Sequence, residues 1–159
     1  MDDLFAARAL HVRAVVFWIG GVAMVTTVLL PAARRLRTSE ERVAFFEAIE
    51  SSFAAQSRVT TLIAAASGFY LVHELDLWWR FLRADYWWMH AMVAIWAIFT
   101  LVLFVIEPLF LHRWFIERAR RKPEATFRLI TRFHWIMLAL SVLTVAGAVA
   151  GSHGFLSFS

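Results

Sequence analysis

Long apolar runs alternate with short charged segments along this chain. Residues 14–33, 86–106 and 133–159 contain no Asp, Glu, Lys or Arg. Each run reaches the roughly 20 residues that a helix needs to cross about 30 Å of hydrocarbon. A fourth uncharged run, residues 59–72, reaches that length only when it is extended beyond His73. The pattern predicts four transmembrane helices, at about residues 9–33, 56–79, 86–112 and 130–152.

Local signals predict where the helices begin and bend. Thr38 and Glu41 have the spacing of a capping box, so a helix should begin after Thr38 and continue through an amphipathic segment into the second span. Pro108 is expected to bend the third span near its inner end, because proline removes a backbone donor. Pro123 is expected in the first turn of the last helix. The predicted fold is all-α, an integral membrane four-helix bundle forming a single domain over residues 1–159.

Basic residues gather on two of the three predicted connections. Of the 16 Lys and Arg residues, twelve lie around the first and third connections, and four lie at the N-terminus and the second connection. Since Lys and Arg favour cytoplasmic loops, both termini are expected outside a bacterial inner (cytoplasmic) membrane. The net charge of +4 is then explained by contacts with the lipid bilayer, not with nucleic acid. No cysteine occurs, which excludes disulfides and thiolate ligands.

Four histidines fall into two pairs of nearly equal spacing. His11 and His90 are 79 residues apart, and His73 and His153 are 80 residues apart. These offsets predict two related helical hairpins, arranged as a parallel repeat. All four imidazoles would then lie near the outer membrane boundary. Imidazoles at such depths either mark a site or serve as amphipathic interfacial groups.

Paired imidazoles from facing helices suit a haem iron, and an apolar bundle accepts the porphyrin. His11 and His90 are therefore the predicted axial ligands of a haem b, with Arg13 or Arg83 near the propionates. The fallback ligand pair is His73 and His153.

Copper at the outer face is the alternative. Imidazole and thioether groups suit copper, especially Cu(I). The residues that would gather the ion are His11, His73, His90 and Met92.

The inner end carries three further polar groups. Glu107 lies well inside an apolar run, where it is expected to pair with an arginine rather than act as a proton relay. His112 and His134 have no repeat partners and are interpreted as snorkelling or capping groups.

Two segments resemble known families. Residues 10–21, with Pro31 and a basic cluster after them, resemble the first helix of the copper-resistance D (CopD-like) membrane domain and of HemJ-type protoporphyrinogen oxidases. The segment Trp88-Met-His90 is similar to the Trp-x-His segment of the HemJ type. The resemblance implies a four-helix membrane protein with a b-type haem at His11. It also implies that Trp88 belongs to the cofactor site.

The leading hypothesis is a haem b-binding inner-membrane protein with an electron-transfer or oxidoreductase role. It would exchange electrons with a quinone or a redox protein partner. Met92 stands where the HemJ type has a lysine, which counts against porphyrinogen oxidase activity but not against haem binding. The alternatives are copper binding or transport at the periplasmic face and a structural subunit of a larger membrane complex. The sequence leaves open whether the chain is an enzyme and whether it forms a homo-oligomer.

Overall fold

The computed structural model describes residues 2–111, 114, 117–118 and 121–153. Every regular element in these residues is helical, which confirms the predicted all-α class for the described part of the chain. In chain order the elements are α1 (Asp2–Met24), the π-helix η1 (Val25–Leu29), α2 (Leu30–Arg34), α3 (Ser39–Glu74), the 3-10 helices η2 (Trp78–Leu82) and η3 (Ala84–Tyr86), α4 (Trp87–Leu101), the π-helix η4 (Val102–Leu111) and α6 (Pro123–Ser152).

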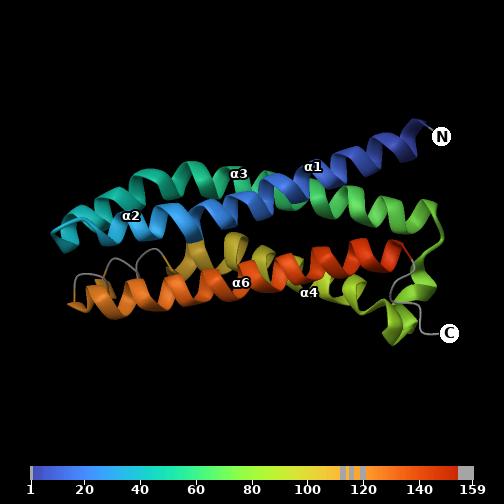
Figure 1. The fold of residues 1–159 in the computed structure, drawn as a ribbon. Coiled ribbons are helices and arrows are strands. Elements are labelled where there is room, and N and C mark those ends of the chain that lie inside the picture. The colour runs from blue at the N-terminus through green and yellow to red at the C-terminus, as the bar shows by residue number, and fades with distance from the viewer. Residues whose placement is uncertain (1, 112–113, 115–116, 119–120, 154–159) are drawn as a thin grey trace.

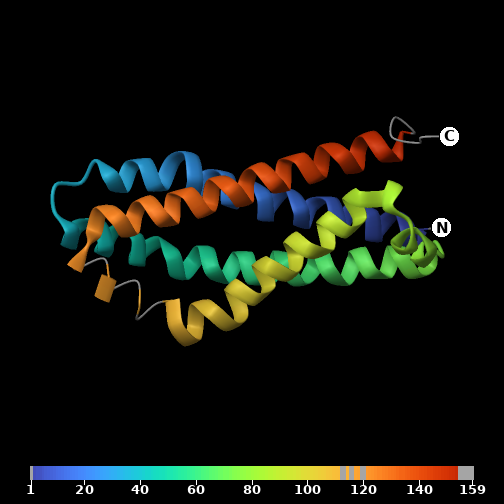
Figure 2. The ribbon, with the colours of Figure 1, turned by 90° about the horizontal axis from the view of Figure 1, so that it is seen from below.

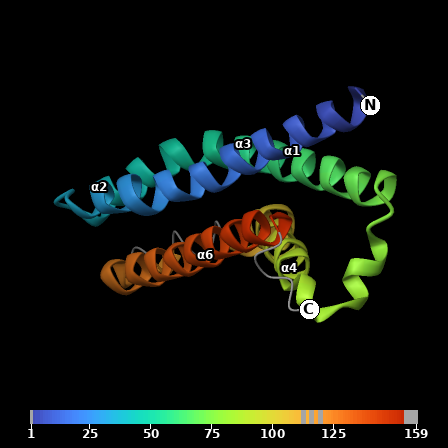
Figure 3. The same cartoon turned by 45° about the vertical axis from the view of Figure 1, so that its right-hand side comes forward.

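The long helices lie in two layers. α1 packs along α3 and α4 packs along α6 (Figures 1 and 3). Figure 2 shows α4 and η4 running obliquely across α3. The start of α1, the η2–η3 connection and the end of α6 lie at one end of the molecule, which we call the terminal end. The α2–α3 connection and the start of α6 lie at the opposite end, which we call the basic end.

Three helical stretches are long and apolar enough to cross a membrane: Asp2–Arg34, Ala84–Leu109 and Pro123–Ser152. They correspond to the first, third and last predicted spans. The predicted end of the third span, at residue 112, lies outside the described residues. The length and composition of these helices mark the chain as a membrane protein.

α3 contains most of the second predicted span, but it is not among the candidate spans in the described residues. Its middle carries the polar run Gln56-Ser57-Arg58, and two threonines follow soon after. Ser57, Thr61 and Ser67 are at most 5% exposed, so these hydroxyl-bearing residues face the other helices. The neighbouring helices thus cover the side of α3 that carries Ser57, Thr61 and Ser67, whereas Gln56 is exposed.

Two local predictions about helix starts are confirmed. The Thr38 side chain accepts from the Glu41 N–H, and the Glu41 carboxylate accepts from the Thr38 N–H, which completes the capping box. The helix that follows is continuous over 36 residues, so the amphipathic segment and most of the predicted second span form one helix. Pro123 occupies the first turn of α6.

A π-helix accompanies the proline in two of the apolar stretches. η1 ends shortly before Pro31, and the Leu30 N–H that follows it donates to the Val25 carbonyl, five residues back. η4 contains Pro108, where the sequence predicted a bend. π-helical segments are rare in proteins, and those that occur are often found at functional sites. Both of these segments lie on the side of the molecule toward the basic end.

Candidate functional site

His11 is fixed in the interface between α1 and α3. Its Nδ1 lies 2.9 Å from the Ala64 carbonyl oxygen and 3.2 Å from the Ser67 hydroxyl. Since a carbonyl only accepts, the ring proton is on Nδ1 and Nε2 keeps its lone pair. Gly68 provides the space, because a Cβ at this position would lie 2.9 Å from His11 Cε1. Among the described residues, Nδ1 of this imidazole therefore has hydrogen-bond partners and Nε2 has none.

His90 is turned toward the connection at the terminal end. Its Nδ1 lies 3.2 Å from the Tyr86 carbonyl oxygen, and its Nε2 lies 3.0 Å from the Phe81 carbonyl oxygen. Because both partners only accept, His90 in this position has no free lone pair unless one of the bonds is given up. Among the contacts of the described residues, none joins His90 to His11.

The other predicted ligands are exposed. His73 lies in the last turn of α3, and His153 caps α6 with its Nδ1 2.8 Å from the Val149 carbonyl. Arg13 is exposed on α1, and Arg83 forms an ion pair with Asp85. Within the described residues, no three side chains among His, Asp and Glu come together as a metal site.

Trp88 packs into a groove on α6. Gly147 and Gly151 have the small-xxx-small spacing that allows close approach to a membrane helix. A Cβ at Gly147 would lie 2.6 Å from Trp87 Cη2, and a Cβ at Gly151 would overlap the Trp88 ring. Trp88 is 7% exposed. Its observed contacts thus join α4 to α6, a role that the glycine spacing could have indicated.

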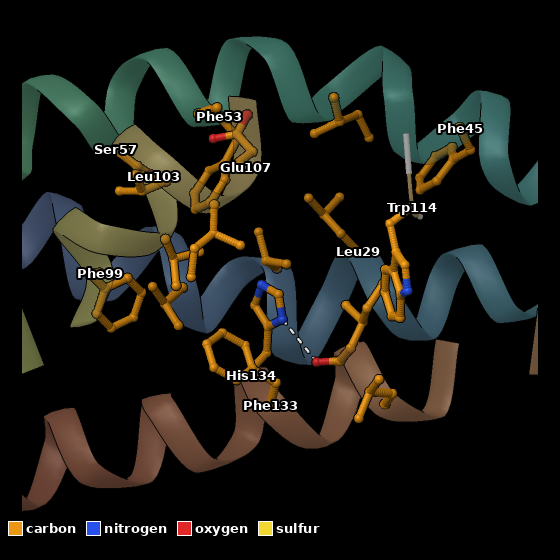
Figure 4. Close-up of a pocket in the computed structure, with 18 residues that line it drawn as sticks. Leu29, Phe45, Phe53, Ser57, Phe99, Leu103, Glu107, Trp114, Phe133 and His134 are labelled. Atoms are coloured by element: carbon orange, nitrogen blue, oxygen red, sulfur yellow. Dashed lines mark hydrogen bonds between the residues drawn. The ribbon is translucent and has the colours of Figure 1, made fainter. Parts of the chain in front are cut away.

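A cavity of about 420 Å³ lies between α1–η1, α3, α4–η4 and α6, toward the basic end (Figure 4). We call it the inner cavity. Most of its lining is aliphatic or aromatic. The aromatic lining residues are Phe45, Phe53, Phe99, Trp114 and Phe133, and the polar ones besides the Trp114 indole N–H are Ser57, Glu107 and His134.

His134 projects from α6 into the inner cavity (Figure 4). Its Nδ1 donates to the Ile130 carbonyl oxygen at 2.9 Å, one helical turn earlier. As at His11, the acceptor-only partner fixes the proton on Nδ1 and leaves a lone pair on Nε2. The sequence interpretation of His134 as a snorkelling or capping group missed this placement. His112 lies outside the described residues.

Glu107 is held at the cavity wall by Arg58. The guanidinium Nη2 lies 2.9 Å from Glu107 Oε2, which confirms that Glu107 pairs with an arginine. The partner comes from α3, 49 residues away. The sequence signal that could have identified this pair is a positively charged residue in one predicted span and a negatively charged residue in another.

Arg58 also completes the π-helix. In a π-helix each N–H bonds the carbonyl five residues earlier, so Pro108 leaves the Leu103 carbonyl without its usual donor. Arg58 Nε donates to that carbonyl at 3.1 Å. Unpaired backbone groups are costly in a membrane, and neighbouring side chains commonly satisfy them. One guanidinium therefore stabilises both the irregular backbone of η4 and the carboxylate of Glu107.

Comparison with known proteins adds no relative. No protein-family model matches the chain, and neither the curated proteins nor the solved structures give a match.

Proposed function

We propose that the chain crosses a bacterial cytoplasmic membrane four times, with the terminal end outside. The support for α3 as the fourth crossing is its position beside helices that are apolar enough to span. His11 contacts Ala64, and a Cβ at Gly21 would lie 2.6 Å from the Phe53 ring, so α3 follows α1 at matching depth. The grouping of Lys and Arg supports the orientation.

We propose further that the protein binds a small, largely apolar, membrane-soluble molecule in the inner cavity. The observation that carries this proposal is one apolar cavity into which two polar groups, Glu107 and His134, converge from different helices. Ligand pockets typically have volumes of about 300–1,000 Å³ and few, well-placed polar groups. The inner cavity fits both descriptions.

The ligand enters from the lipid. Leu129 and Phe133 line the inner cavity and yet are 49% and 38% exposed, so the cavity reaches the surface between α6 and its neighbours. That surface lies within a helix long enough to span the bilayer. A molecule dissolved in the hydrocarbon can therefore reach Glu107 and His134 without passing through water.

Filling the cavity is expected to abolish binding. Val25 is 5% exposed and lines the cavity, whereas Val28, three residues later in the same π-helix, is 56% exposed and does not line it. The probe is 2-decyl-1,4-dimethoxybenzene, measured by equilibrium binding to protein in lipid nanodiscs against empty nanodiscs. Saturable binding is expected for the unchanged chain and for Val28→Trp. Val25→Trp should lose it. Saturable binding that Val25→Trp keeps would exclude the inner cavity as the binding site.

A second candidate function, haem b binding at the terminal end, is favoured by one observation at His11. Histidines that ligate a metal almost always donate their other ring N–H to a carbonyl or carboxylate, as His11 does to Ala64. His11 Nε2 would hold the iron, which would supply one-electron transfer when bound. His90 would have to release the Phe81 carbonyl to serve as the opposite ligand.

Two glycine substitutions test the haem candidate. Gly68→Ala crowds the His11 ring, whereas a Cβ at Gly20 meets nothing within 4 Å. The purified protein is expected to show a haem b signal in the reduced-minus-oxidised absorption spectrum. The signal should be lost in His11→Ala, weakened in Gly68→Ala and kept in Gly20→Ala. A spectrum without haem from the unchanged, fully helical protein rules this candidate out.

A further inference from the structure

We infer that the inner cavity takes a hydroquinone, an aromatic ring with hydroxyl groups on opposite sides, in preference to the corresponding quinone. This inference rests on the proposed binding function of the cavity. It depends on the hydrogen-bonding character of the groups that face the ligand, which the size of the cavity alone does not determine.

The first of these groups is an acceptor. Because His134 Nδ1 donates to the Ile130 carbonyl, Nε2 of the neutral ring can only accept a hydrogen bond. Within the described part of the chain, Nε2 has no hydrogen-bond partner. An acceptor among apolar walls favours a ligand that brings its own O–H, because a buried polar group without a partner is costly.

The second group is also an acceptor. Glu107 Oε2 accepts a hydrogen bond from Arg58, and the carboxylate has further lone pairs that can accept. Arg58 itself is not among the residues that line the inner cavity, and its Nη2 and Nε donate to Glu107 and Leu103. The wall formed by η4 thus presents a carboxylate to the ligand, and not the guanidinium that holds it.

The two acceptors belong to different walls of the cavity. Figure 4 shows Glu107 on the side of α3 and η4 and His134 on the side of α6. The indole nitrogen of Trp114 is on the side turned away from both. Ser57 carries a hydroxyl, which both donates and accepts and so does not discriminate between ligands. A ligand with donors at two opposite positions matches this arrangement, whereas a fatty acid or long-chain alcohol brings only one.

Aromatic side chains beside both acceptors favour a flat ring. Phe53 lies beside Glu107 (Figure 4), and the Phe133 ring lies edge-to-face with the His134 imidazole, with the ring centroids 5.9 Å apart. Aromatic rings pack against one another in offset or edge-to-face geometry, with more stabilisation than their buried area alone provides. An apolar substituent on the ligand would leave through the exposed side at Leu129, into the lipid.

Three ligands that share a six-membered ring and a decyl chain test the inference: decylhydroquinone, decylquinone and 2-decyl-1,4-dimethoxybenzene. Only the first has O–H donors. In nanodiscs, decylhydroquinone is expected to bind the unchanged chain at least about tenfold more tightly than the other two, since a hydrogen bond lost at each acceptor weakens binding by roughly that factor.

One histidine on α6 and one at its C-terminal cap provide a matched pair of variants. His134 and His153 both donate Nδ1–H to the carbonyl four residues earlier, but only His134 lines the inner cavity. His134→Phe should lower the affinity for decylhydroquinone about tenfold and leave the affinity for the dimethoxy compound unchanged. His153→Phe should change neither affinity.

The outcomes separate the two proposals. Saturable binding of all three ligands with equal affinity overturns the hydroquinone inference and leaves the cavity as a binding site. Tighter binding of decylquinone than of decylhydroquinone also overturns the inference, because it requires donors in the wall. Loss of the preference in His153→Phe as well as in His134→Phe would show that the preference does not come from the cavity. No saturable binding of any of the three contradicts the proposed function itself.

Discussion

Replacing Arg58 with alanine is expected to lower the free energy of unfolding by about 3 kcal/mol, the scale seen when one member of a shielded ion pair is removed. The side chains of Arg58 and Glu107 are 35% and 18% exposed, so the ion pair is partly shielded. The substitution leaves the Glu107 carboxylate without its cation and the Leu103 carbonyl without its donor. The measurement is unfolding in detergent micelles, followed by circular dichroism.

The two consequences of this substitution can be separated. Pro108→Ala restores a backbone N–H that can donate to the Leu103 carbonyl. In that background Arg58→Ala should therefore lower the free energy of unfolding by about 1 kcal/mol less. Arg121→Ala is the control, because its ion pair with Glu117 joins side chains that are 76% and 66% exposed. Such exposed pairs contribute less than about 1 kcal/mol. Equal effects of Arg58→Ala and Arg121→Ala would contradict the role assigned to Arg58.

Replacing Gly151 with alanine is expected to destabilise the packing of α4 on α6 by about 1–3 kcal/mol, the usual cost of overpacking. The new Cβ would overlap the Trp88 ring, which is nearly buried and has little room to move. Thermal unfolding in micelles measures the effect. Gly20→Ala is the matched control, since nothing lies within 4 Å of its added Cβ. Gly20→Ala should be neutral, or stabilising by up to about 1 kcal/mol, because alanine favours a helix.

A compensating variant shows whether the overlap with Trp88 is the cause. In a Trp88→Leu background the shorter side chain leaves the space above Gly151 open, so Gly151→Ala should cost little there. The difference between the two backgrounds is the coupling between the two residues. Additive effects of the two substitutions would show that Gly151 matters for a reason other than contact with Trp88.

Much of the fold could be predicted from local sequence, because the signals are local. A helix end depends on the few residues around it, so Thr38 and Pro123 identified two helix starts directly. Three apolar runs likewise identified three helices long enough to span. α3 was harder to predict, because the polar groups near Arg58 are covered only once the other helices are in place. Its apolar length alone does not distinguish a spanning helix from a helix that packs against one.

The candidate site was predicted only in part. The sequence identified His11 and His90 as polar groups in apolar surroundings, but it could not give the acceptors around each ring. Those acceptors are backbone carbonyls, Ala64 for one ring and Phe81 for the other, and any residue type would present them. The position of His134 at the inner cavity could not be predicted for a similar reason. Its importance comes from a cavity formed by four separate segments, and no repeat or motif marks the position.

The π-helices η1 and η4 also change which side of each helix the later residues occupy. A π-turn holds roughly one residue more than the 3.6 of an α-turn, and each added residue rotates the rest of the helix by about 100°. Phe99, Val102, Leu103, Ile106 and Glu107 line the inner cavity and so lie on one side of this stretch. Deleting Val105, which does not line the cavity, would turn the carboxylate away from it while keeping every lining side chain in the sequence. This protein is therefore expected to tolerate substitutions in η4 better than deletions.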